Sequence, residues 1–230
     1  MKIYPHISEN PFSDKEILKQ LHNSAVKYSQ LVNCNLLFIY AQNKNKDTPW
    51  QYFETEFKAE NFQHLTGCKS KVLENGRPAL SKADFYENAL KQTLERKDFT
   101  FNVNRKTASA KLRSLPKLLQ YEFAKLYEVG DKNVPTQHNV FDFAVGTRME
   151  ILCYSHPKNN DIFTVPRSVL NRPIIDYVFN PLKIMLIFKK DANASCYEDI
   201  YFSICKLEDL SEKLKGFINE IKDCVNINYK

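Results

Sequence analysis

The chain has 230 residues, of which 43% are hydrophobic and 13% aromatic, and its formal net charge is +6. This composition excludes a disordered chain and provides enough apolar side chains for a buried core. No apolar run approaches the about 20 residues of a membrane-spanning helix, and Met1 to His6 contain no signal-peptide core. We therefore expect a cytoplasmic protein without a membrane partner.

The positive charge permits a nucleic-acid partner but does not by itself indicate one. The cysteines lack the paired CxxC spacing of a zinc or redox site, so we predict reduced thiols. Cys153 and His156 have the spacing of half a zinc site, but no matching second half follows. The sequence thus predicts no metal and no other cofactor.

The N-terminal part predicts a helix followed by strands. Ser13 is followed three residues later by a glutamate, which is the pattern of a capping box, and the apolar spacing continues to about Val32. Residues 35–41 have the length and composition of a buried strand. Residues 42–49 are polar and predict a turn, and strict alternation over residues 50–58 predicts a half-buried strand.

Residues 62–67 read Phe-Gln-His-Leu-Thr-Gly. In a strand, residues two apart face the same side, so we expect His64 and Thr66 to stand together on one face. An imidazole and a hydroxyl placed side by side can carry protons or bind a phosphate. This pair is therefore a candidate reaction centre, although an edge strand whose polar side chains have ordinary partners gives the same pattern.

Two further helices are predicted downstream. The first begins after a serine cap at Ser81, and the second covers residues 105 to about 127, with Pro116 expected to kink it or to restart it after Ser114. Residues 105–120 include no acidic side chain, so this helix is a candidate surface for RNA phosphates, although a solvated basic face is the simpler interpretation. Its basic side chains are Arg105, Lys106, Lys111, Arg113 and Lys117.

The pattern turns to β structure after residue 130. Because strands occur in both halves and no linker divides them, we predict one α+β domain with a mostly antiparallel sheet and flanking helices. The expected elements are a hairpin over 139–145 and 148–154, an extended piece over 162–170, strands over 184–189 and 199–205, and a closing helix over 207–224.

The order of these signals resembles a known family, the phage-associated branch of the small metal-independent nucleases named for barnase, EndoU, colicin and RelE. The Phe-x-His-Leu-Thr-Gly stretch at residues 62–67 is the specific motif, and order and spacing carry the rest. The resemblance implies a nuclease-like core over residues 50–206. Residues 1–49 would then be a helix and strand extension packed on the core, and 207–230 a C-terminal helix. The other matching segments are Phe85–Leu90, the basic helix, the hairpin, Val165-Pro166 and the final strand pair.

The resemblance implies an endoribonuclease that acts as a toxin or effector of a phage or mobile element. Such enzymes cleave RNA by attack of the ribose 2′-oxygen on the adjacent phosphate, which requires a base, an acid and cationic groups. His64 suits either proton-transfer role because its ordinary pKa is about 6.5, and Thr66 would donate to a phosphate oxygen. The remaining roles would fall to Lys58, Lys106, Arg148 or Arg167, with Lys106 and Arg167 preferred.

Two other functions remain open. Glu54, Glu56 and Lys58 share one face of a predicted strand, as the carboxylates and lysine of metal-dependent nucleases do, although such a face is commonly just exposed to solvent. A catalytically inactive nuclease-like protein that inhibits a host defence complex fits the same fold. The partners to expect are therefore RNA and, in the second alternative, a host or cognate inhibitor protein.

Overall fold

The structure of this chain is a computed structural model. It describes residues 10–41, 50–120, 128–131, 141–147, 149–156, 163–177, 182–206, 209 and 212–221. Within these ranges, no helix has the length and apolar character needed to cross a membrane.

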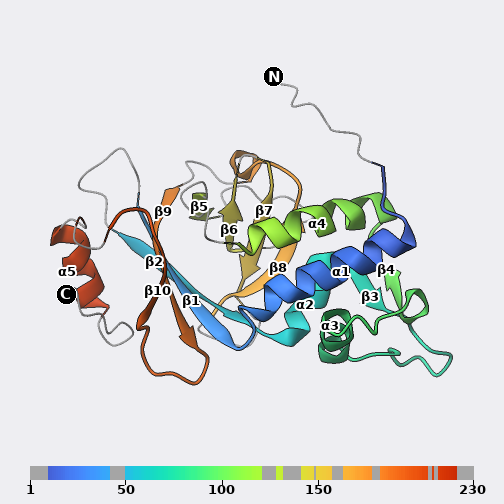
Figure 1. Ribbon diagram of the computed structural model, residues 1–230. Coiled ribbons are helices and arrows are strands. Elements are labelled where there is room, and N and C mark those ends of the chain that lie inside the picture. Colours follow the sequence, from blue (N-terminus) through green and yellow to red (C-terminus); the bar gives the residue numbers. More distant parts are fainter. Residues whose placement is uncertain are drawn as a thin grey trace.

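Helices and antiparallel strands make up one α+β domain, as predicted (Figure 1). The helices are α1 (Asp14–Ser29), α2 (Ala59–Thr66), α3 (Lys82–Leu90), α4 (Arg105–Leu118) and α5 (Glu212–Glu220), with short 3₁₀ turns at Arg96–Asp98 and Ile174–Asp176. The strands are β1 (Cys34–Ala41), β2 (Gln51–Phe57), β3 (Cys68–Ser70), β4 (Phe99–Phe101), β5 (Glu128–Asp131), β6 (Phe143–Gly146), β7 (Ile151–Ser155), β8 (Val165–Leu170), β9 (Leu182–Asp191) and β10 (Asp199–Ser203).

The main sheet has the strand order β2-β1-β9-β5-β6-β7-β8, and β10 also pairs with β9. Its two end strands meet, because Thr164, directly before β8, forms a parallel bridge with Thr55 of β2. The Thr164 amide donates to the carbonyl of Glu54 at 2.9 Å, and the Glu56 amide donates to the carbonyl of Thr164 at the same distance. This closure pairs backbone groups that a sheet edge would leave open. β3 and β4 form a separate small sheet.

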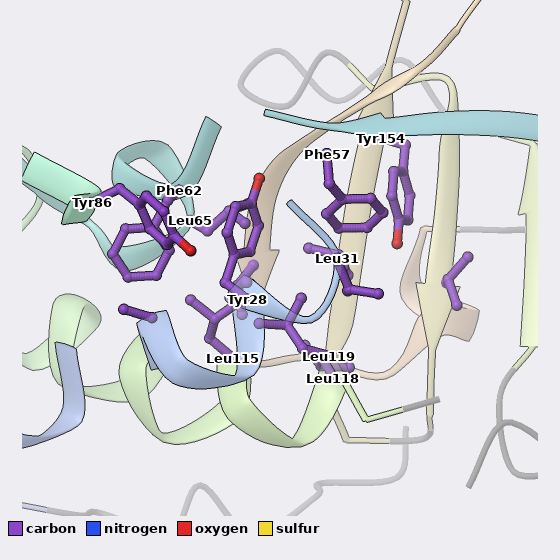
Figure 2. Close-up of a cluster of buried hydrophobic side chains, with 14 of the residues drawn as sticks. Tyr28, Leu31, Phe57, Phe62, Leu65, Tyr86, Leu115, Leu118, Leu119 and Tyr154 are labelled. Carbon is purple, nitrogen blue, oxygen red and sulfur yellow. The ribbon is translucent and has the colours of Figure 1, made fainter. Parts of the chain in front are cut away.

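Two cores lie on opposite faces of the central strands. β1 alternates along its length, so Leu36 and Phe38 enter the larger core while Leu37 and Ile39 enter the smaller one. The larger core lies under α1 to α4, and Figure 2 shows Tyr28 of α1 among side chains from α2, α3, α4 and the sheet. The smaller core is covered by α5 through Leu214 and Ile218.

Helix α1 confirms the predicted capping box. The Ser13 hydroxyl accepts from the amide of Glu16, and the Glu16 carboxylate accepts from the amide of Ser13 at 2.7 Å. The strands predicted over 35–41 and 50–58 are also present as β1 and β2. Helix α4 continues through Pro116, so of the two outcomes expected there, a kink or a restart after Ser114, the restart is wrong. The helix ends at Leu118, and residues 121–127 of the expected helix lie outside the described part.

The strand predicted over residues 62–66 is wrong, because residues 59–66 form helix α2. Phe62, Leu65 and Thr66 are buried, and their spacing of three and four residues is helical. The two-residue alternation of Phe62, His64 and Thr66 occurs in the same short stretch, so the pattern alone cannot separate helix from strand. His64 and Thr66 therefore do not share a face.

Candidate functional site

Helix α2 is held at both ends. At its start, the Tyr28 hydroxyl donates to the carbonyl of Lys58 at 2.9 Å. At its end, Gly67 adopts a left-handed φ of 75°, a backbone conformation that favours glycine. A side-chain carbon at Gly67 would lie 3.2 Å from the backbone of Ala108 and 3.2 Å from Cδ of Lys111. The glycine therefore lets the end of α2 pack directly against α4.

His64 lies on the exposed side of α2. Partial burial of its imidazole lowers the pKa of His64 below its usual value, and the positive charges of Lys82, Arg167 and Lys111 lower it further. Lys82 begins α3, Arg167 lies on β8 and Lys111 lies on α4, and each of these elements contacts α2. Three separate elements thus bring cations to one neutral imidazole.

Arg167 owes its position to an irregularity in β8. Cys153 of β7 pairs with Ser168, but the next β7 residue, Tyr154, pairs with Pro166, so Arg167 is left without a partner in the register. An extra residue of this kind forms a β-bulge, which redirects the side chain and is common beside active sites. Arg167 is exposed at this point, and its neighbour Ser168 is half-buried.

Lys111 is buried on the inner face of α4 and is only 9% exposed. Its Nζ donates a hydrogen bond to the hydroxyl of Ser168 at 2.8 Å. Burial lowers the pKa of Lys111 because the charged ammonium is poorly solvated there. The site therefore combines an exposed imidazole, an exposed guanidinium and a buried amine.

The other predicted catalytic residues lie in different surroundings. Thr66 is fully buried, and its hydroxyl donates to the carbonyl of Gln63 at 2.8 Å and accepts from the amide of Cys68 at 3.1 Å. It therefore stabilises the turn after α2. Lys106 is exposed at the start of α4, and Lys58 forms an ion pair with Glu56 at 2.8 Å. Arg148 lies outside the described residues.

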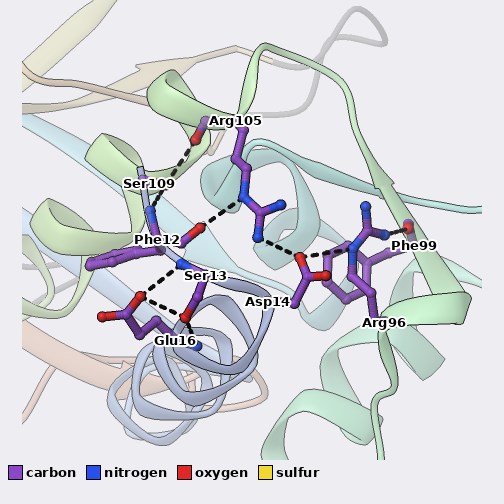
Figure 3. A network of polar contacts seen from close by, with 8 residues as sticks. All are labelled: Phe12, Ser13, Asp14, Glu16, Arg96, Phe99, Arg105 and Ser109. Carbon is purple, nitrogen blue, oxygen red and sulfur yellow. Dashed lines mark hydrogen bonds and ion pairs between the residues drawn. The ribbon is translucent and has the colours of Figure 1, made fainter. Parts of the chain in front are cut away.

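The basic side chains of helix α4 have different surroundings. Figure 3 shows that Arg105 donates from Nε to the carbonyl of Phe12, at 2.8 Å, and pairs with the carboxylate of Asp14. Arg113 lies over the ring of Phe12, with its guanidinium carbon 4.1 Å from the ring centre, and it donates to the carbonyl of Asn10. Of the side chains predicted to bind RNA, Arg105 and Arg113 therefore hold the N-terminal segment, Lys111 faces the site and Lys117 is exposed.

Glu54 and Glu56 both point to one side of β2, as the metal-dependent alternative requires. Burial raises the pKa of Glu54, while Lys190 and a hydrogen bond from Tyr197 oppose the shift. Glu56 is neutralised by its ion pair with Lys58. Among the side chains that the structure describes, no cluster of three His, Cys, Asp or Glu residues has the geometry to hold a metal ion.

Sequence reasoning missed Lys82 and Ser168. Lys82 had one available signal, since it directly follows the predicted helix cap at Ser81. Ser168 follows Val165-Pro166, and a proline inside a strand often marks a bulge. Neither signal shows that α3 and β8 meet at α2, because that proximity depends on the tertiary fold.

The comparisons with known proteins identify a family. A model of the family described as phage-Barnase-EndoU-ColicinE5/D-RelE like nuclease4 matches residues 20–206. No curated protein and no solved structure matches the chain. The matched range includes α2 with His64, α3 with Lys82, α4 with Lys111 and β8 with Arg167. The chain therefore belongs to this phage-associated family of barnase-, EndoU-, colicin- and RelE-like nucleases.

Proposed function

We propose that this protein is an endoribonuclease that cleaves RNA without a metal ion, by attack of the ribose 2′-oxygen on the neighbouring phosphate. The observation that carries the proposal is the packing of α3, α4 and β8, which carry Lys82, Lys111 and Arg167, against the helix that carries His64 in a member of a nuclease family. A neutral imidazole accepts the 2′-hydroxyl proton, and nearby cations stabilise the charge that develops on the phosphate.

His64 is assigned as the general base. Its lowered pKa keeps the imidazole unprotonated near neutral pH, which is the state that a base requires. Arg167 is assigned to the phosphate because a guanidinium offers several donors in a planar array that matches phosphate oxygens. Lys82 adds a further positive charge near the imidazole. Thr66 has no part in this assignment, since both of its hydrogen bonds lie within its own turn.

The proposal extends to the biological role. The family description names phages, and a ribonuclease carried by a phage or mobile element would act as a toxin or effector inside a host cell. RNA is the proposed substrate, and a host protein or a cognate inhibitor is the proposed protein partner. Growth arrest on expression of the wild type, but not of a His64→Ala variant, would support this role.

The first test is cleavage of total cellular RNA by the purified protein in EDTA. The wild type should cleave, and the products should end in 2′,3′-cyclic phosphates and 5′-hydroxyls. His64→Ala should lose the activity, whereas His156→Ala should keep it, because His156 is an exposed histidine outside the site. Both variants must give the same circular dichroism spectrum as the wild type.

Each other result selects a different function. Cleavage that requires Mg²⁺ and is lost in Glu54→Gln would favour the metal-dependent alternative. No cleavage with or without Mg²⁺ would overturn the nuclease proposal and favour the inactive, partner-binding alternative. Equal cleavage of a DNA strand would overturn attack by the 2′-oxygen, because DNA lacks the 2′-hydroxyl.

A further inference from the structure

Lys111 is a buried lysine with an unusual environment. It lies between Ala108 and Leu115 on the apolar face of α4, where a leucine or methionine would be expected. In the described part of the chain, no carboxylate forms an ion pair with its ammonium group. The ammonium group donates a hydrogen bond to the hydroxyl of Ser168 at 2.8 Å. A buried charge with so little compensation is costly, so structural stability alone does not account for this residue.

The surrounding chain directs the Lys111 side chain toward the site. Gly67, at the end of α2, leaves space for the aliphatic part of Lys111, whose Cδ would lie 3.2 Å from a side-chain carbon at that position. The far end of the side chain then reaches Ser168 on β8, next to Arg167 at the bulge. The amine is therefore placed between the helix that carries His64 and the strand that carries Arg167.

The titratable groups that interact with Lys111 are His64 of α2 and the Cys153 thiol of β7. Arg167 of β8 lies next to Ser168 and acts on the same imidazole. Burial raises the pKa of Cys153 to about 12, so this thiol stays neutral and does not compensate the ammonium. Lys82 of α3 acts on the same imidazole as Lys111.

We propose that Lys111 is the general acid of the cleavage reaction and that Ser168 is the residue that positions it. This inference rests on the proposed function. A ribonuclease of this type needs a second proton-transfer group besides its base. Lys111 is an ionisable donor that is hydrogen-bonded to Ser168 of β8, both α4 and β8 pack against the helix that carries His64, and its charge acts on that imidazole.

The two proton-transfer groups have environments suited to different roles. Neighbouring cations and burial favour the neutral form of His64, which is the form of a base. Burial also lowers the pKa of Lys111 from its usual value of about 10.5, which makes its ammonium a stronger proton donor than a surface lysine. Divergent environments of two titratable groups are the usual way to assign an acid and a base.

The proposed step is balanced in atoms and charge. His64 takes the proton from the 2′-hydroxyl while the 2′-oxygen forms a bond to phosphorus. The bond from phosphorus to the 5′-oxygen breaks, and Lys111 gives its proton to that oxygen. The products are a 2′,3′-cyclic phosphate and a 5′-hydroxyl, and solvent later returns a proton to Lys111 and removes one from His64.

The test uses an RNA oligonucleotide that the wild type cleaves at a mapped site, and the same oligonucleotide with sulfur in place of the bridging 5′-oxygen at that site. A thiolate leaves without protonation, so the second substrate does not need a general acid. Lys111→Met should slow cleavage of the oxygen substrate by about 10²- to 10⁴-fold. On the sulfur substrate the loss should be less than about tenfold, because the step that needs the acid has been removed.

Matched variants separate this role from others. His64→Ala should lose activity on both substrates, because a base is needed for each. Lys19→Met, which removes an exposed lysine of α1, should leave both rates unchanged. Ser168→Ala should slow the oxygen substrate selectively and move the basic limb of its pH profile, whereas Ser168→Thr, which keeps the hydroxyl, should restore the wild-type profile.

The outcomes distinguish this inference from the proposed function. If the wild type cleaves RNA and Lys111→Met loses equal activity on both substrates, or none on either, Lys111 is not the acid and the ribonuclease proposal still stands. If the wild type cleaves neither substrate, the proposed function itself fails. If Lys111→Met does not fold, the pH profile of the wild-type cleavage rate provides the test. The rate should fall at high pH on the oxygen substrate but not on the sulfur substrate. An equal fall on both substrates would overturn the inference.

Discussion

Helix α4 has two sets of basic side chains, and their surroundings differ in kind. Arg105 and Arg113 contact carbonyls, a carboxylate and an aromatic ring of the N-terminal segment, all near the surface. Lys111 is buried, and its ammonium donates to the hydroxyl of Ser168. The two arginines have partners that compensate a positive charge, whereas the described residues give Lys111 no ion pair, and the serine orients its ammonium.

Positive charge along a helix therefore does not by itself identify a nucleic-acid surface. Arginine side chains that bind an N-terminal segment of the chain give the same sequence pattern as arginines that bind phosphate. Arg105 and Arg113 differ from Lys111 in the elements that they contact: the arginines contact the N-terminal segment, and Lys111 contacts β8. The two arginines should therefore matter for stability, and Lys111 for the reaction.

The largest effect is expected where α2 meets α4. Gly67→Ala places a side-chain carbon against Ala108 and Lys111 and forces alanine into a left-handed conformation. Conformational strain and overpacking together should lower the free energy of unfolding by about 2–4 kcal/mol. Urea denaturation measures this loss.

Gly76 provides the matched control for that change. Its φ is 77°, but nothing lies within 4 Å of the position that an added carbon would take. Gly76→Ala should therefore show the conformational cost alone, about 1 kcal/mol. Equal losses in the two variants would mean that close packing of Gly67 on Lys111 does not contribute.

The next largest effect is the difference in stability between a variant of Arg113 and a variant of Lys111. Arg113→Ala removes the contact with the Phe12 ring and the hydrogen bond to the carbonyl of Asn10, so stability should fall by about 1–2 kcal/mol. Lys111→Met replaces a buried amine with an apolar side chain of similar size and should change stability by less than about 1 kcal/mol or increase it. RNA cleavage should show the opposite order of sensitivity.

Thermal or urea unfolding, run beside the RNA cleavage assay, measures both quantities for each variant. A variant pair in which Lys111→Met is the less stable would contradict the view that this lysine is retained for the reaction. Strong loss of RNA cleavage in a folded Arg113→Ala variant would place the arginine group in the active surface.

A smaller effect is expected at the start of α1, next to the arginine group. Ser13→Ala removes the hydroxyl that accepts from the amide of Glu16, and loss of such a cap costs about 1 kcal/mol. Ser29→Ala, near the other end of the same helix, removes an exposed hydrogen bond to the carbonyl of Val26 and should have almost no effect. The two midpoints of urea denaturation give the comparison, and equal midpoints would show that the cap does not stabilise the helix.

Local signals predicted much of the fold because they act over a few residues. The capping box at Ser13 depends on two side chains three positions apart, and the alternation of β1 and β2 depends on the two-residue period of a strand. The strand predicted over residues 62–66 is wrong because so short a segment contains both spacings. Phe62 and Thr66 fit the two-residue alternation with His64, whereas Phe62 and Leu65, three residues apart, both enter one core in the helix.

The candidate site was predictable only in part. His64, Arg167 and Lys111 were each identified from residue type, motif or charge, but the sequence assigned Lys111 to an RNA-binding surface rather than to the neighbourhood of His64. The distinction depends on the bulge at Arg167 and on the bond from Lys111 to Ser168, which join elements far apart in the chain. No local pattern contains that information.

The smallest expected effect is the titration of His64. Its folded pKa is lowered by burial and by Lys82, Arg167 and Lys111, so the folded protein binds fewer protons than the unfolded chain between that pKa and the ordinary value of about 6.5. The contribution of His64 to stability is therefore complete above about pH 6.5 and is lost as the pH falls through the folded pKa. NMR titration of the imidazole should give a midpoint below about 6.5.

Variants at the neighbouring cations test the cause of that shift. Removing the charge in Arg167→Gln or Lys82→Met should raise the midpoint of His64 toward its ordinary value, and each change should be smaller than the effect of burial, which is the largest contribution. The same titration distinguishes the two basic side chains of α4. Lys111→Met should also raise the titration midpoint of His64, whereas Arg113→Ala should leave it unchanged, because Arg113 is not among the charges that act on the imidazole. An equal shift in both variants would mean that the field at His64 comes from the helix as a whole and not from the lysine on its inner face.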